Sequence, residues 1–125
     1  MPPERRHWAV RGATTVERDD AELVAAAVRE LLAEIERRNA LAPEVIVSAH
    51  FTMTADLRSE FPARAARRHG WTDVAMLSTT EIPVSGSLPR CIRVLVHLEF
   101  PEPRAAVRHV YLRDARDLRP DLPHY

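Results

Sequence analysis

Arginine is the residue type with the clearest chemical potential in this sequence. The chain has 125 residues, and all 18 of its basic residues are arginines, because no lysine occurs. Three of them, Arg11, Arg93 and Arg108, fall in segments with strand character. A guanidinium group is planar and binds a carboxylate through two parallel hydrogen bonds. One arginine on a strand is usually a solvated, ion-paired side chain, but several on one sheet favour a pocket for a small carboxylated molecule.

Other chemistry-bearing motifs are missing from the sequence. It has no Walker A loop or Gly-x-Gly-x-x-Gly to cradle a phosphate, and no Gly-x-Ser-x-Gly nucleophile motif. Its six histidines show no paired ligand spacing, so we expect no metal site and no cofactor. His109 is a candidate general base, although a strand histidine without an identified partner is more often simply packed. We interpret Cys91 as a small core residue rather than a nucleophile.

The composition narrows the class of protein. Eighteen acidic residues balance the arginines, the pI is near 7.0, and neither a nucleic acid nor an anionic membrane is an expected partner. The longest apolar run, residues 23–28, is too short to span a bilayer. No apolar signal core follows residues 1–6, and the single cysteine fits a reducing compartment, so we expect a cytoplasmic protein.

One long helix is predicted over residues 20–38. Asp19, with Glu22 three residues later, is a capping signal at its start, and Asn39 with Pro43 is expected to end it. The apolar positions repeat with helical spacing: Leu23, Val24, Ala27, Val28, Leu31, Leu32 and Ile35. The opposite, solvent-facing side is expected to hold Arg29, Glu30, Glu34, Glu36 and Arg38.

The remaining segments predict about five strands and a short helix. The strands are expected at 8–16 with a bulge at Gly12, and at 44–51, 71–77, 91–100 and 107–113. Residues 92–100 alternate between apolar and mostly polar positions, and Pro101 and Pro103 should end that strand. The short helix is predicted at 61–68, closed by Gly70, and residues 78–89 should form a loop. The result is an α+β fold with a mixed sheet in a single domain, residues 1–125.

Six segments resemble the monofunctional α/β-type chorismate mutases, the class distinct from the all-helical one. They occur in the same order and at near-constant spacing from about Ala9 to Leu122. The segments are 10–19 (VRGATTVERD), 61–64 (FPAR), 70–71 (GW), 91–93 (CIR), 108–112 (RHVYL) and 118–122 (LRPDL).

The resemblance implies a homotrimer in which the subunit sheets pack into a pseudo-α/β barrel, with active sites between neighbours. It also implies the rearrangement of chorismate to prephenate, on the route to phenylalanine and tyrosine. This reaction is an intramolecular Claisen rearrangement and needs no cofactor or proton transfer. The enzyme has to hold a flexible dianion in its reactive conformation and stabilise charge as the ether bond breaks.

The resemblance implies three catalytic residues. Arg11 would grip a carboxylate of the bound molecule. Arg93 would face the breaking ether oxygen, where negative charge accumulates. Glu81 would hydrogen-bond the ring hydroxyl and offset charge on the ring fragment.

The same resemblance implies a set of substrate-binding residues. Tyr111 would donate its hydroxyl to a substrate carboxylate, and Arg119 lies in a tail that would fold over the mouth of the site. Ser78 stands where some family members carry a cysteine, and only residues 123–125 follow the tail motif, which puts full closure in question. The rest of the pocket wall would comprise Leu77, Ser78, Thr79, Thr80, Phe61, Arg64 and Arg67.

Two other classes of function compete with this interpretation. One is a trimeric, arginine-lined imine or enamine deaminase, which would lack Glu81 in this register. The other is a non-catalytic binding domain descended from the mutase. The joint presence of Arg11, Glu81, Arg93 and Tyr111 disfavours that second class.

Overall fold

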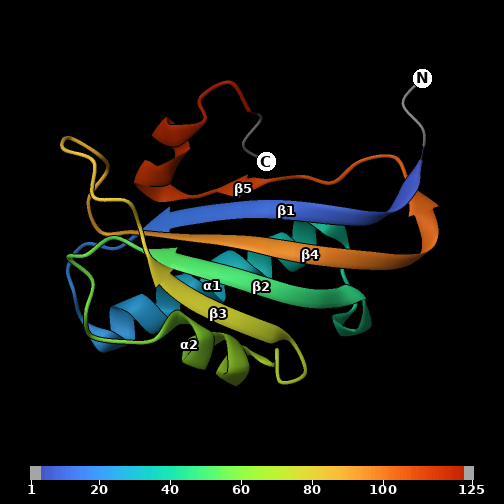
Figure 1. Cartoon of the computed structure of the whole chain (residues 1–125), viewed down its shortest axis with the longest axis horizontal. Helices are drawn as coiled ribbons and strands as arrows, with labels where there is room; N and C mark the ends of the chain where they lie inside the picture. The colour runs from blue at the N-terminus through green and yellow to red at the C-terminus, as the bar shows by residue number, and fades with distance from the viewer. Residues whose placement is uncertain (1–3, 123–125) are drawn as a thin grey trace.

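The structure is a computed structural model that describes residues 4–122. Five strands form one mixed sheet in the order β3-β2-β4-β1-β5 (Figure 1). The strands are β1 (Arg5–Thr15), β2 (Ile46–Met53), β3 (Ala75–Thr80), β4 (Cys91–Arg104) and β5 (Val110–Tyr111). β4 is antiparallel to both β1 and β2, whereas β3 and β5 pair in parallel at the two edges. The predicted α+β class, single domain and five-stranded sheet are confirmed.

One face of the sheet is covered by helices. The helix α1 (Ala21–Asn39) lies behind the sheet in Figure 1 and packs beside α2 (Pro62–His69). Two short 3-10 helices, η1 (Pro43–Val45) and η2 (Arg113–Leu118), precede β2 and follow β5. The predicted alternation in β4 is confirmed, because its inward side chains are all buried in the core: Ile92, Val94, Val96, Leu98 and Phe100. The opposite face of the sheet is largely open and carries the polar side chains.

The start of α1 is capped by Asp20 rather than Asp19. Asp20 Oδ1 accepts hydrogen bonds from the backbone N–H groups of Glu22 and Leu23. Asp19 instead accepts from the backbone of Arg58 and Ser59, and its hydrogen bond from the Ser59 hydroxyl is the main cause of its lowered pKa. Asp19 therefore anchors the loop that leads into α2.

The far end of α1 also differs from the prediction. The helix ends at Ala40, which adopts φ +49°, while Asn39 is still helical and its side chain is buried. Glu36 and Arg38 do not face solvent. Glu36 accepts from the Trp71 indole and pairs with His69 at 2.6 Å, which joins α1 to the end of α2.

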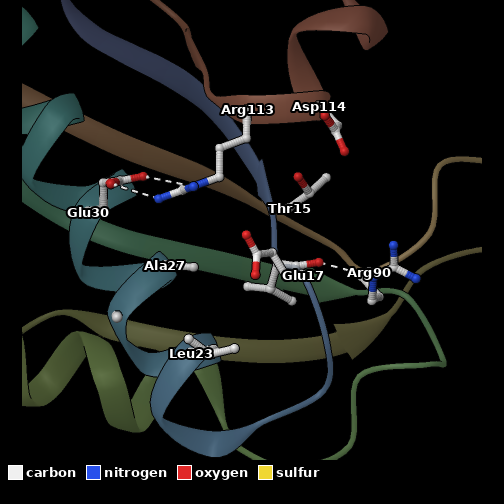
Figure 2. A pocket seen from close by; sticks show the side chains of 10 residues that line it. Thr15, Glu17, Leu23, Ala27, Glu30, Arg90, Arg113 and Asp114 are labelled. Carbon is white, nitrogen blue, oxygen red and sulfur yellow. Dashed lines mark hydrogen bonds and ion pairs between the residues drawn. The ribbon is translucent and has the colours of Figure 1, made fainter.

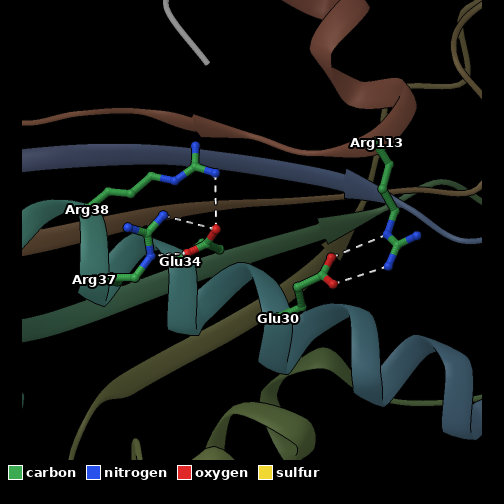
Figure 3. Close-up of polar contacts among 5 residues, drawn as sticks. All are labelled: Glu30, Glu34, Arg37, Arg38 and Arg113. Carbon is green, nitrogen blue, oxygen red and sulfur yellow. Dashed lines mark hydrogen bonds and ion pairs between the residues drawn. The ribbon is translucent and has the colours of Figure 1, made fainter. Parts of the chain in front are cut away.

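Arg38 reaches from α1 toward β1, and its side chain is only 4% exposed (Figure 3). The predicted pair with Glu34 is present at 3.1 Å, and Glu34 also binds Arg37 at 2.6 Å. Because Glu34 accepts from two guanidinium groups, its pKa is lowered, chiefly by the hydrogen bond from Arg37.

Gly12 produces no bulge. The β1–β4 register runs without a break from His7 to Thr15, and the irregularity lies between Arg5 and His7. A Cβ atom added at Gly12 would lie 2.8 Å from Ile35 Cδ1 and 3.2 Å from Leu31 Cδ1. The glycine is therefore needed because α1 packs directly against the backbone of β1.

Three strand boundaries differ from the sequence prediction. β4 continues through Pro101 and Pro103, because both prolines lie between the pairings of Glu99 and Arg104, where β1 makes no ladder contact. β3 spans Ala75–Thr80 instead of 71–77, so it includes residues expected in the loop. β5 is only two residues long, because the chain before it is held by the Asn39 side chain rather than by a neighbouring strand.

Candidate functional site

The open face of the sheet brings Arg93 and Glu81 together. Arg93 Nε lies 3.1 Å from Glu81 Oε2, and the same oxygen accepts a hydrogen bond from the Thr52 hydroxyl. Both contacts fall on Oε2, and within residues 4–122 no hydrogen-bond donor is placed on Oε1. The Arg93 side chain is 49% exposed, so its guanidinium group remains accessible from solvent. This cluster combines a fixed carboxylate with a cation that a ligand can reach.

Strand register explains why these side chains meet. Thr52 in β2 lies directly opposite Arg93 in β4, which in turn lies opposite Ala13 in β1. Residues paired in this way point to the same face of a sheet. The row continues to Thr79 in β3 and to Tyr111 in β5. Residues from all five strands are thereby aligned across the open face.

A second polar group lies at the β1–β5 edge. The backbone N–H of Arg11 donates to His109 Nδ1 at 3.0 Å, so this nitrogen is an acceptor and carries no proton. Burial lowers the pKa of His109, and the neighbouring positive charges of Arg11 and Arg119 lower it further. His109 therefore supports the backbone of Arg11 as a neutral imidazole, and is not simply packed as the sequence indicated.

The segment after η2 adds Arg119 and Asp121 to this edge. Arg119 binds Asp121 through two hydrogen bonds of 3.0 and 2.9 Å. This bidentate contact lowers the pKa of Asp121 to about 2, with a smaller contribution from the charge of Arg11. Arg119 also interacts with Tyr111, so one guanidinium links a predicted binding residue to the Asp121 carboxylate.

Tyr111 is held by a small apolar cluster that is separate from the main core. Its ring packs with Ala13 and Ala115, and Leu88 and Leu118 cover the cluster. Tyr111 is 5% exposed, which fixes the ring on the β1 side of the Arg93 row. The 3-10 helix η2 therefore positions Tyr111 as well as the segment that carries Arg119.

Cys91 lies next to Arg93 on the same strand and is buried. Burial raises the pKa of its thiol to about 11, and the opposing effect of the Arg93 charge is smaller. The thiol is therefore neutral near pH 7 and is not activated as a nucleophile. This agrees with its interpretation as a core residue.

The remaining predicted residues are not brought to this cluster within one chain. Phe61 and Arg64 lie at the start of α2, where Phe61 is 65% exposed and Arg64 pairs with Glu60 at 2.7 Å. Ser78 is opposite the core residue Phe51, so it points to the helix-covered face, away from Arg93. Leu77 lies on the open face, two residues before Thr79, and is 69% exposed on the outer strand. The exposed residues Thr80 and Arg67 complete this second group.

Two hollows lie near predicted residues, and neither encloses the Arg93 cluster. A cavity of about 540 Å³ lies between the end of β1, α1 and η2 (Figure 2). Its arginines are already engaged: Arg113 forms two hydrogen bonds to Glu30, and Arg90 Nε donates to the Val16 carbonyl. A smaller cavity of about 240 Å³ is bordered by Glu81 and residues 82–89. Within residues 4–122, neither of these two hollows is lined by Arg11, Arg93 or Tyr111.

Thr52 and Asp121 were not identified from the sequence as site residues. Thr52 lies one residue beyond the predicted end of its strand, and only the register with β4 reveals that it faces Arg93. Asp121 is part of the LRPDL motif, which was the available signal for it. No group of three or more histidine, cysteine or acidic side chains suited to a metal ion is found among the described residues. No helix in the same part of the chain has the length and hydropathy of a membrane span.

Comparison with known proteins connects this geometry to a family. Residues 7–122 match the family described as chorismate mutase type I. A chorismate mutase from Thermus thermophilus is 50% identical over 114 residues, which cover 90% of this chain and 93% of the relative. The corresponding enzyme of Bacillus subtilis is 41% identical and 90% of each chain is covered. A solved chorismate mutase structure from Clostridium thermocellum has a TM-score of 0.84 and 44% identity, covering 88% of this chain and 98% of the other.

The fold, the arginine-bearing open face and these similarities define an isomerase that acts on a small molecule. The chain belongs to the type I chorismate mutase family.

Proposed function

We propose that the protein converts chorismate to prephenate in the cytoplasm, by an intramolecular Claisen rearrangement without a cofactor, in the synthesis of phenylalanine and tyrosine. The observation that supports this most directly is the pairing of Arg93 with Glu81 on the open face, in a chain of this family. A cation and a carboxylate side by side suit a reaction in which the ether oxygen becomes negative and the ring fragment becomes positive.

Arg93 is proposed to stabilise the ether oxygen. Its Nε lies 3.1 Å from Glu81 Oε2, and the side chain is 49% exposed, so substrate can reach the guanidinium group. Glu81 uses Oε2 for Arg93 and Thr52, so Oε1 is the atom proposed to accept the ring hydroxyl of chorismate. Both groups are held by protein contacts before substrate arrives, which lowers the reorganisation needed during the reaction.

Arg11, Tyr111 and Arg119 are proposed to bind a substrate carboxylate. Two observations support this role: Arg119 already binds a carboxylate, that of Asp121, through two hydrogen bonds, and it interacts with Tyr111, while the charge of Arg11 also acts on Asp121. Substrate would take the place of Asp121 on Arg119, and the segment after η2 would then close over it.

The site is proposed to be completed by a neighbouring subunit in a homotrimer whose open sheet faces pack into a pseudo-α/β barrel. Two observations support this. The Arg93 cluster and the α2 group, namely Phe61, Arg64 and Arg67, do not form one pocket within a chain. Of the predicted β3 residues, Leu77 and Thr79 lie on the open face, whereas Ser78 and Thr80 face the helices. Phe61 and Leu77 also expose large apolar surfaces, which is typical of residues that become covered in an interface.

The test is direct. Purified protein is mixed with chorismate, without added cofactor and with a chelator present, and the loss of chorismate absorbance is followed. We expect turnover to prephenate at a rate unaffected by the chelator. Folded protein that leaves chorismate unchanged would contradict the proposed activity, and turnover that the chelator abolishes would contradict the cofactor-free mechanism.

A further inference from the structure

We propose that Thr52 is a positioning residue for the reaction, which holds the Glu81 carboxylate so that the Arg93 guanidinium stays available to substrate. This inference rests on the proposed function. It concerns a residue that lies beside the proposed catalytic pair and has no direct role in the substrate chemistry described above.

Two backbone features place Thr52 next to Glu81. Thr52 and Arg93 are opposite each other in β2 and β4, so both side chains rise from the open face at the same level. Glu81 follows β3, and its backbone N–H donates to the Met53 carbonyl at 2.9 Å, which fixes the residue beside the end of β2. The Thr52 hydroxyl then donates to Glu81 Oε2, on the same oxygen that Arg93 Nε contacts.

In this arrangement, the Arg93–Glu81 ion pair uses only one of the two carboxylate oxygens, Oε2. A carboxylate and a guanidinium left to themselves favour a bidentate pair, in which two N–H groups bind both oxygens. Such a pair would use a terminal nitrogen of Arg93 and the free Oε1 of Glu81, the two atoms proposed to meet the substrate. Because Thr52 and Arg93 Nε both occupy Oε2, the carboxylate is turned so that Oε1 stays open. Loss of the hydroxyl should therefore impair catalysis more than substrate binding.

The test compares Thr52→Val, which replaces the hydroxyl by a methyl group, with Thr52→Ser, which keeps the hydroxyl. We expect Thr52→Val to lower kcat about tenfold with KM changed less than about threefold, because a hydrogen bond to a charged group is lost. Thr52→Ser should stay within about threefold of wild type. Thr14→Val is the matched control, since Thr14 is a fully buried strand residue whose hydroxyl has no hydrogen-bond partner. That control should keep wild-type kcat.

A double-mutant cycle with Glu81→Gln separates positioning from a general structural effect. If Thr52 acts through Glu81, Thr52→Val should cost much less in the Glu81→Gln background than in the wild type. Equal losses in both backgrounds, or a folded Thr52→Val enzyme with kcat within twofold of wild type, would overturn the proposal. Thermal unfolding checks that each variant is folded. If Thr52→Val does not fold, Thr52→Ala is used in its place. Wild-type protein that does not turn over chorismate would contradict the proposed function instead, so the two failures are distinguishable.

Discussion

Asn39 and Arg108 are joined by two hydrogen bonds that link the end of α1 to the chain entering β5. Asn39 Nδ2 donates to the Arg108 carbonyl at 2.9 Å, and Asn39 Oδ1 accepts from the Arg108 backbone N–H at 2.7 Å. The Asn39 side-chain amide thus binds both the backbone N–H and the carbonyl of Arg108, which lies between β4 and β5. His109 and Tyr111 follow directly, so the position of the β1–β5 group depends on this contact.

We expect Asn39→Ala to destabilise the protein by about 2–4 kcal/mol, because the loss of a buried amide leaves backbone groups without these partners. The carboxylate-binding residues should also be less well held, so KM for chorismate should rise. Arg37→Ala is the control. Arg37 is an exposed partner of Glu34, and the loss of such a surface pair should destabilise the protein much less than the loss of the buried amide. Chemical denaturation of both variants checks the difference, and an equal, small effect would contradict this assignment.

Gly12→Ala tests the close approach of α1 to β1. The new methyl group would press on Ile35 Cδ1 and Leu31 Cδ1, the ends of flexible side chains, so the helix has to shift slightly or the side chains have to adopt other rotamers. We expect a loss of about 1–3 kcal/mol in stability, the usual cost of overpacking a core. Ala26→Ser is the control, because it adds one atom at an exposed position of α1. Gly86→Ala is unsuitable, because Gly86 has φ +83°, which an alanine adopts only with strain. A Gly12→Ala protein as stable as wild type would show that the packing is looser than described.

The elements with strong periodicity were predicted well from the sequence. The apolar stripe of α1 and the alternation of β4 depend on local spacing, which one sequence displays directly. Arg38 and Glu36 were assigned to solvent because helical spacing shows which residues share a face and cannot show that α2 and the β5 edge approach that face. The prolines of β4 were misread for a similar reason, because only the pairing of Glu99 and Arg104 reveals that the positions between them need no ladder hydrogen bond.

The candidate site was predicted residue by residue from family resemblance, and its internal contacts were not. Thr52 carries no motif, and its role depends on the register of β2 with β4, which is a long-range property. Residues 78–80 were predicted to lie in a loop, but as part of β3 they alternate between faces, so Thr79 joins the Arg93 row while Ser78 faces the helices. That the Arg93 cluster and the α2 group meet in one site of the assembled protein is a prediction, which the mixing experiment below tests.

The pKa of His109 predicts a pH dependence of stability. The folded protein lowers this pKa below its usual value near 6.5, through burial and through the charges of Arg11 and Arg119. Below pH 6.5 the unfolded chain therefore binds a proton that the folded protein resists. The contribution of neutral His109 is present above pH 6.5 and is lost as the pH falls from 6.5 through the lowered pKa.

We expect the unfolding free energy to decrease between pH 7 and pH 5, and His109→Gln to reduce this decrease. Denaturation at fixed protein concentration checks it, because dissociation of an oligomer would otherwise contribute. The difference between wild type and variant is the relevant quantity, because it isolates the contribution of His109. If that difference is constant with pH, the environment of His109 does not depress its pKa.

Arg93→Ala should reduce kcat roughly a thousandfold or more. The negative charge on the ether oxygen grows only as the carbon–oxygen bond stretches, so a cation placed there stabilises the transition state more than the ground state. Removal of one preorganised donor from comparable sites costs about 3 kcal/mol. Arg93→Lys keeps the charge but loses the planar shape and the Nε contact with Glu81, so it should also be severely impaired. A folded, oligomeric Arg93→Ala enzyme within tenfold of wild type would remove Arg93 from the centre of the mechanism.

Mixing two inactive variants tests whether the site is shared between subunits. Arg93→Ala damages the open-face group, and the double variant Arg64→Ala, Arg67→Ala damages the α2 group. In a cyclic trimer with interfacial sites, each site takes one group from each of two neighbours, so random mixing in equal amounts should leave about a quarter of the sites intact. We therefore expect the mixture, after dissociation and reassembly, to recover about a quarter of wild-type activity. Light scattering should report three times the 14.2 kDa chain mass for every sample. A mixture that reassembles into trimers and stays inactive would show that both groups serve the same subunit, and a fully active monomer would exclude the shared site altogether.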